Sequence, residues 1–216
     1  MATNLIVVRH GQSLSNIRET FTGQMDSPLT ELGHKQAACT AEYLADFSID
    51  AIYSSDLMRA MQTAEPVAKS HGLEIVPDAR LREICGGDWE GRVGAEIEKL
   101  YPENYAVWKT DVYRSTPDGG ESFVEVAART HEFLQEILQK HRGQTVAIFS
   151  HALAVRSLAC EWFGLGLEDV KSVPWSANAS VSIVEYNDDN SFSKLILYGY
   201  KDHQGNLSTV LAKGLA

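Results

Sequence analysis

Short apolar runs alternate with longer amphipathic stretches along this chain, and that alternation constrains its fold more than any other feature. The apolar runs are candidate strands at residues 5–8, 51–54, 74–76, 145–149, 181–185 and 194–198. Apolar residues recur at helical spacing at residues 30–47, 57–70 and 122–140, and in a stretch that begins just after His151. Strands that alternate with helices are typical of α/β proteins. We therefore predict a three-layer sandwich, in which helices flank a mostly parallel central sheet.

The organisation of the 216 residues favours one domain, because no internal repeat, low-complexity tract or linker interrupts them. Residues 92–120 are the least regular part, and we expect a lid-like insertion there. No apolar run approaches the roughly 20 residues of a membrane helix. A cleavable leader would remove residues near the start that we regard as candidates for catalysis. We therefore expect a single domain over residues 1–216, a cytoplasmic location and no membrane partner.

The charge and the metal-binding residue types exclude several classes of function. A net charge of −10 disfavours nucleic acid as a partner, so an anionic substrate would need a local cluster of positive charge. Cys39, Cys85 and Cys160 form no C-x-x-C pair, and we interpret them as reduced structural residues. No histidine or cysteine pair has the spacing of a zinc site. We therefore expect no metal ligands.

Polar side chains suited to phosphate chemistry follow several of the predicted strands. Arg9 and His10 follow the first strand, and His151 follows another. Arg59 lies in the helix after the second strand, and Glu83 comes after the third. Because ligands bind beyond the carboxyl ends of parallel strands, we expect these five side chains at one edge of the sheet.

These residue types fit phosphoryl transfer. Guanidinium groups match phosphate oxygens with fork geometry and keep their charge. An imidazole is a nucleophile only when it is neutral, and positive neighbours keep it neutral. A second, protonated histidine would add positive charge as the transition state forms. A carboxylic acid can protonate the leaving oxygen and then activate water as the carboxylate.

Six segments resemble, in the same order, the motifs of the histidine phosphatase superfamily, the phosphoglycerate mutase-like proteins. The resemblance extends from about residue 5 to residue 185. The segments are residues 5–13 with Arg9-His10-Gly11, residues 22–33 with Leu29-Thr30-Glu31-Leu32-Gly33, residues 54–64 with Arg59 and Gln62-Thr63-Ala64, residues 81–91 with Leu81-Arg82-Glu83 and Gly87-Asp88-Trp89-Glu90-Gly91, Ser150-His151-Ala152, and Asn178-Ala179-Ser180-Val181-Ser182.

The resemblance implies a role for each matching residue. In that family pattern His10 accepts the phosphoryl group, and Glu83 is the proton donor and then the base. The other implied site residues cradle the phosphoryl oxygens (Arg9, Arg59 and His151) or lie beside the phosphate or the leaving group (Asn16, Thr22, Gly23 and Ala152). The resemblance implies neither a metal nor another cofactor.

The family contains both phosphatases and mutases. Its mutases use a long insertion with two adjacent arginines after the catalytic glutamate, whereas residues 84–120 form a short segment in which Arg92 and Arg114 stand apart. Thr22-Gly23, in contrast, resembles the mutase version of that loop. We predict a metal-independent phosphatase that hydrolyses a small phosphomonoester through a phosphohistidine. A cofactor-dependent phosphoglycerate mutase is the alternative, and a non-catalytic phosphate-binding module is a weaker one. A homodimer is left open.

Two further predictions concern the surroundings of the site. Trp89 and Trp108 either shape the leaving-group site or pack in the core, and Trp175 is interpreted as a core or rim residue. His203 lies in the tail after Tyr200, which is long enough to fold over the pocket.

Overall fold

A computed structural model describes residues 2–209, so the end of the tail, residues 210–216, lies outside the described residues. Its centre is a six-stranded sheet with the order β3-β2-β4-β1-β5-β6. The first four strands in this order pair in parallel. β5 pairs antiparallel with β1, and β6 pairs antiparallel with β5. The strands are β1 (Thr3–Arg9), β2 (Ala51–Ser54), β3 (Ile75–Pro77), β4 (Thr145–Ser150), β5 (Val181–Tyr186) and β6 (Phe192–Tyr200).

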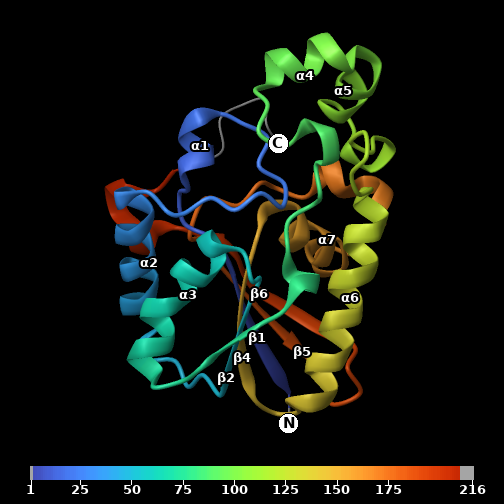
Figure 1. The fold of residues 1–216 in the computed structure, drawn as a ribbon. Helices are drawn as coiled ribbons and strands as arrows, with labels where there is room; N and C mark the ends of the chain where they lie inside the picture. Colours follow the sequence, from blue (N-terminus) through green and yellow to red (C-terminus); the bar gives the residue numbers. More distant parts are fainter. Residues whose placement is uncertain (1, 210–216) are drawn as a thin grey trace.

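Helices cover both faces of this sheet, which confirms the predicted three-layer α/β sandwich (Figure 1). One layer consists of α2 and α3, and the other of α6 and α7. Each helix begins within one or two residues of its predicted start, because the apolar periodicity marks the side that packs in the core. The four helices are α2 (Glu31–Leu44), α3 (Met58–His71), α6 (Phe123–Lys140) and α7 (Ala152–Trp162).

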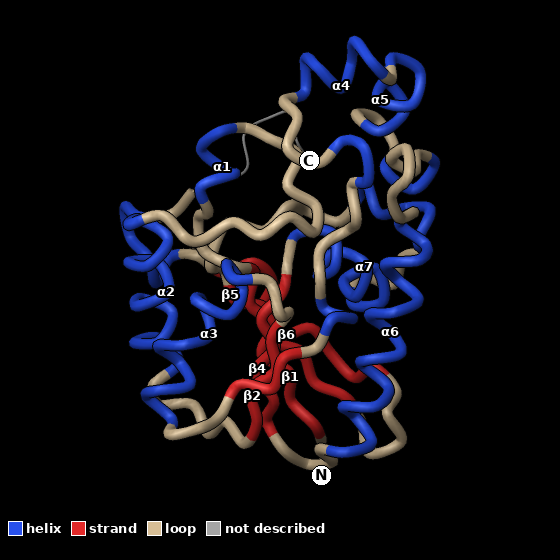
Figure 2. The backbone as a smooth tube through the Cα atoms, in the orientation of Figure 1, coloured by secondary structure: helices blue, strands red, loops and turns tan. Residues whose placement is uncertain are grey.

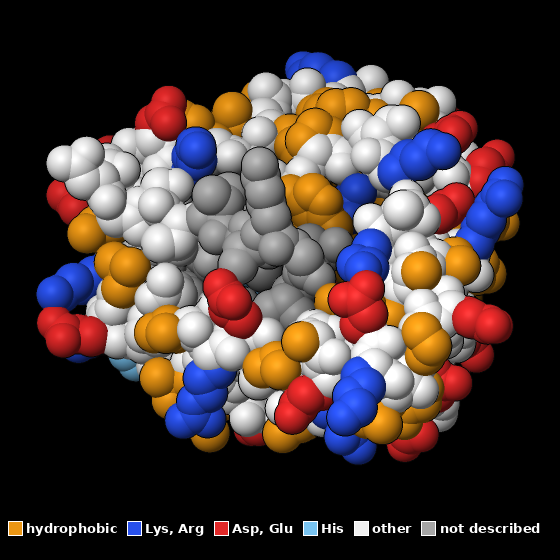
Figure 3. Space-filling view, turned by 90° about the horizontal axis from the view of Figure 1, so that it is seen from above, with side chains coloured by type: hydrophobic (Ala, Val, Ile, Leu, Met, Phe, Trp, Pro, Cys, Tyr) orange, Lys and Arg blue, Asp and Glu red, His pale blue; other side chains and the backbone are white. Residues whose placement is uncertain are grey.

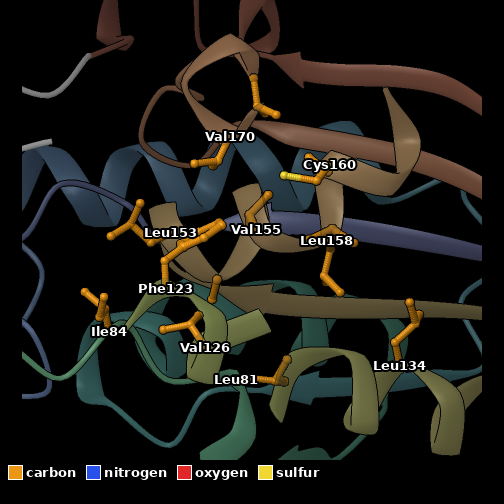
Figure 4. Close-up of a cluster of buried hydrophobic side chains, with 14 of the residues drawn as sticks. Leu81, Ile84, Phe123, Val126, Leu134, Leu153, Val155, Leu158, Cys160 and Val170 are labelled. Atoms are coloured by element: carbon orange, nitrogen blue, oxygen red, sulfur yellow. The ribbon is translucent and has the colours of Figure 1, made fainter. Parts of the chain in front are cut away.

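The alternation of side chains along β1 connects the two halves of the core. Leu5 and Val7 pack in the cluster that includes α6 and α7, which Figure 4 shows in close-up. Ile6 and Val8 point the other way and pack with α2 and α3. Burying each such side chain contributes roughly 1.5–3 kcal/mol, so both faces hold β1 in place. The residues that follow β1 are therefore fixed in position.

Helix caps explain two of the helix starts. The Thr30 hydroxyl accepts a hydrogen bond from the Gly33 N–H at 2.9 Å and so caps α2. Ser122 and Glu125 form a reciprocal capping box at the start of α6.

Short helices that the periodicity did not predict lie at the carboxyl end of the parallel strands. They are α1 (Leu14–Arg18), α4 (Gly94–Leu100) and α5 (Pro102–Trp108), followed by a 3-10 turn at Val112–Arg114. In Figure 1, α4 and α5 stand above this end of the sheet, and Figure 2 shows that most long loops gather here too. Among residues 2–209, no helix combines the length and the apolar character needed to cross a membrane.

Candidate active site

His10 and His151 lie next to each other because the strands before them pair in parallel. Arg9 at the end of β1 is opposite Ser150 at the end of β4, and the His10 N–H donates to the Ser150 carbonyl at 2.9 Å. The two imidazole ring centroids are 5.1 Å apart. Strand pairing thus brings together two of the predicted site residues.

The side chain of His10 is held in one tautomer. Its Nδ1 lies 2.7 Å from the carbonyl oxygen of Gly11. Since a carbonyl can only accept, Nδ1 carries the proton, and Nε2 of the neutral ring keeps its lone pair. Burial, followed by the positive charges of Arg59 and Arg9, lowers the pKa of His10 well below 6.5. At neutral pH the ring is therefore uncharged, the form that a nucleophile requires.

Carbonyl groups hold the two arginines without neutralising them. Arg9 Nη1 donates to the Ser176 carbonyl at 2.5 Å, while Arg59 donates to the Gly23 and Met25 carbonyls at 2.8 and 3.0 Å. Burial lowers the pKa of each guanidinium to about 10, so both are still charged at neutral pH. Within the described residues, neither forms an ion pair with a carboxylate. Two positive charges are thus available to an anion.

His151 differs from the protonated histidine that we predicted. Its Nδ1 accepts a hydrogen bond from Arg59 Nε at 3.2 Å, so its Nε2 carries the proton and donates to the Ser55 hydroxyl at 2.8 Å. Burial, followed by the charge of Arg59, lowers the pKa of His151 well below 6.5. The ring is neutral here because a proton on Nδ1 would face a guanidinium N–H.

Glu83 enters the site from the segment after β3. Its Oε1 accepts hydrogen bonds from the Ile84 N–H at 2.9 Å and the Leu153 N–H at 3.2 Å. Leu153 lies in the first turn of α7, where backbone N–H groups have no partner within the helix and can bind a carboxyl oxygen. The carboxyl group is thereby oriented beside the pocket.

One pocket collects nearly all the predicted residues. Asn16 and Thr22 line it, and so does Gly23, whose φ of 51° suits glycine. A side chain at Gly23 would also collide with the Glu90 carboxylate. Arg9, His10, Arg59, Glu83 and Ala152 complete the predicted part of the lining. Fully buried His151 is not part of that lining and contacts it through His10 and Arg59.

An apolar wall completes the pocket, and most of it was not predicted. Its members come from loops and helix ends on five segments: Phe21, Ile84, Trp108, Leu153 and Trp175. Phe21 is next to Thr22 and Ile84 is next to Glu83 in the sequence, so their position beside predicted site residues could have indicated that they line the pocket. Trp175 had no such signal.

The structure separates the two tryptophans that the sequence left as alternatives. Trp108 lines the pocket, whereas Trp89 is fully buried and packs edge-on against the rings of Phe21, Tyr105 and Trp108. The indole N–H of Trp89 donates to Asp118 at 3.2 Å. Trp89 therefore supports the wall from behind.

His203 is outside the pocket lining, where it contacts the Thr40 hydroxyl and stacks on Tyr43. No group of three histidine, cysteine, aspartate or glutamate side chains suited to a metal ion occurs within residues 2–209.

The surface around this end of the molecule carries charges of both signs. Figure 3 looks down on the end where α4 and α5 lie, and lysines, arginines and acidic residues are interspersed around its rim with apolar patches between them.

Comparisons with known proteins show which sequences and structures this chain resembles. The profile of the histidine phosphatase superfamily (branch 1) matches residues 5–197. Phosphoserine phosphatase 1 of Hydrogenobacter thermophilus is 36% identical over 180 residues, which cover 83% of this chain and 85% of that protein. A glucosyl-3-phosphoglycerate phosphatase of Mycolicibacterium vanbaalenii is 33% identical over 183 residues, or 82% and 81% of the two chains. The solved structure of Bacillus stearothermophilus YhfR has a TM-score of 0.89 at 33% identity, with 94% and 99% coverage.

Proposed function

Since the chain belongs to the histidine phosphatase superfamily (branch 1), we propose that it hydrolyses a small phosphomonoester through a phosphorylated His10, without a metal ion. The observation that carries this proposal is the state of His10, a neutral imidazole with a free Nε2 beside two charged guanidinium groups. The phosphatase names of the relatives support the same reaction class.

In the first step, Nε2 of His10 attacks phosphorus, and the bond to the leaving oxygen breaks. Arg9 and Arg59 bind the phosphoryl oxygens and stabilise the charge that develops on them. Glu83, protonated for this step, gives its proton to the leaving oxygen, so that a neutral alcohol departs. The Gly11 carbonyl, which already accepts the Nδ1–H bond, stabilises the charge that the ring gains.

In the second step, water attacks the phosphohistidine and the bond from phosphorus to nitrogen breaks. Glu83, now a carboxylate, takes the proton from the water. Inorganic phosphate leaves and His10 returns to its neutral form. His151 contacts His10 and Arg59 and maintains the positions of both. We assign Asn16, Thr22, Gly23 and Ala152 to the binding of phosphate or leaving group.

Phosphate release from a panel of phosphomonoesters in excess EDTA tests this proposal. We expect turnover in EDTA that His10→Ala abolishes, and a loss on the order of a hundredfold for Glu83→Gln with phosphate binding retained. The exposed His34, which lies outside the pocket, provides a matched control as His34→Ala. Full activity of Glu83→Gln would require another acid, and full activity of His10→Ala would refute the nucleophile.

The mutase alternative makes a different prediction in the same experiment. Isomerisation of 3-phosphoglycerate that depends on a bisphosphoglycerate primer, with little phosphate release, would identify a mutase. We expect phosphate release instead, because the segment after Glu83 lacks an adjacent arginine pair to bind a carboxylate.

A further inference from the structure

The pocket lining combines polar residues that suit a phosphoryl group with apolar side chains that have no assigned ligand. In the described part of the chain, Arg9 and Arg59 are the cations of the lining, and the proposed function uses both for phosphate. Glu83 adds a carboxyl group to the same lining. Among the described residues of the lining, a carboxylate on the leaving group would therefore find no third cation to bind it.

Trp175 is one of these apolar lining residues, and a buried cation holds its ring. The guanidinium carbon of Arg156 lies 3.9 Å from the centroid of the Trp175 ring. Arg156 is only 2% exposed, and its Nη2 donates to the carbonyls of Val170 and Val173. The ring itself is 36% exposed, so one part faces the pocket and solvent while Arg156 supports it.

The residue after Trp175 contacts one of the two arginines that we assign to phosphate binding. Ser176 is the residue whose carbonyl accepts the hydrogen bond from Arg9. The indole is thus anchored beside a guanidinium that contacts the phosphoryl oxygens in the proposed reaction.

Trp108 provides a second, rigid aromatic surface. Its ring centroid lies 5.4 Å from that of Phe21 and 5.6 Å from that of Trp89. Trp108 is buried, and both neighbours are buried as well. Flat rings held in this way lose little freedom when a flat ligand packs on them.

We propose that Trp175, positioned by Arg156, is a specificity-determining residue that, with Trp108, selects phosphomonoesters whose leaving group is planar and uncharged. This inference rests on the proposed function of the same site. The leaving group is an aryl or arylmethyl alcohol. It differs from the phosphorylated acids in the names of the two relatives, since the described lining offers a carboxylate no cation beyond the two assigned to phosphate.

Benzyl phosphate and methyl phosphate test the role of Trp175, because their alcohols have similar acidity and only one carries a ring. We expect wild-type kcat/KM to favour benzyl phosphate by about tenfold or more over methyl phosphate and over 3-phosphoglycerate. The benzyl-to-methyl ratio is the kcat/KM for benzyl phosphate divided by that for methyl phosphate. Trp175→Ala should lower this ratio about tenfold, mainly by raising KM for benzyl phosphate, whereas Trp175→Phe should retain most of the preference for benzyl phosphate.

Arg156→Lys tests the positioning role, because an ammonium keeps the charge but not the flat stacking surface. We expect it to lower the benzyl-to-methyl ratio, whereas a purely structural role would lower kcat/KM for both esters alike. If Arg156→Lys does not fold, the benzyl-to-methyl ratio of Trp175→Ala decides whether Trp175 determines specificity. Phe163→Ala is the matched control, since that ring is 39% exposed, lies outside the pocket lining and should leave the ratio unchanged.

The outcomes separate this inference from the proposed function. His10-dependent turnover with an unchanged ratio in Trp175→Ala, or with 3-phosphoglycerate preferred to benzyl phosphate, would overturn the inference alone. No turnover of any ester by the wild type would overturn the proposed function and the inference together.

Discussion

Replacing His10 and His151 by glutamine should make the folded protein less sensitive to acid. Both imidazoles are buried and neutral, and their pKa values lie well below 6.5, chiefly because of burial. In the unfolded chain each histidine binds a proton as the pH falls through about 6.5. The unfolded state therefore binds more protons than the folded state below that pH.

The sign and size of the effect follow from this difference. A lowered pKa in the folded state means that stability is complete above pH 6.5 and is lost as the pH falls toward the folded-state pKa. Between neutral pH and pH 5.5, each buried neutral histidine lowers the free energy of unfolding by about 1.4 kcal/mol, and the pair lowers it by about 2.8 kcal/mol. His203, whose pKa burial also lowers, stays in every variant and leaves a residual dependence.

Urea unfolding at pH 7.5 and 5.5 measures the effect for the wild type, both single variants and the double variant. Each His→Gln change should reduce the loss of unfolding free energy between these pH values by about 1.4 kcal/mol, and the double variant should reduce it by about twice as much. Because the two pH values are compared within each variant, any loss of stability that the substitution causes at both pH values cancels. An unchanged pH dependence in the double variant would refute the neutral state of the two rings.

Three other changes have expected outcomes. Since burial lowers the pKa of Arg9 and Arg59 to about 10, raising the pH through that value should remove their charge and raise KM for phosphate esters; a constant KM up to pH 10.5 would contradict this. Trp89→Ala should lower the free energy of unfolding by about 3–5 kcal/mol, and a loss under about 1 kcal/mol would show that the ring does not support the wall. Thr63→Val leaves the Gly11 N–H, now bonded to the Thr63 hydroxyl at 2.9 Å, without an acceptor, so urea unfolding should show a loss of about 1–3 kcal/mol.

The strands of the sheet could be predicted because they contain apolar runs. The four covering helices could be predicted because they are long enough for apolar residues to recur at helical spacing. β1 and β4 each contain an unbroken run of four apolar residues, since helices cover both of their faces. The short helices α1, α4 and α5 span five to seven residues, which is too few for a helical pattern to stand out.

The charged part of the site could also be predicted, because its residues follow strand ends and match a family pattern. The apolar wall could not, since Trp175 reaches the pocket through tertiary contacts of an irregular segment. The neutral state of His151 was missed because it depends on the direction of the Arg59 Nε–H, which only the folded geometry defines.

Trapping the phosphoenzyme tests the central claim most directly. The protein is mixed with a phosphomonoester in excess EDTA, quenched within one turnover under alkaline denaturing conditions that preserve phosphohistidine, and digested for mass spectrometry. We predict one phosphoryl group on His10, absent from His10→Ala and accumulating in Glu83→Gln with esters whose leaving group needs no protonation. A phosphoryl group on another residue, or turnover without any phosphoenzyme, would contradict the account.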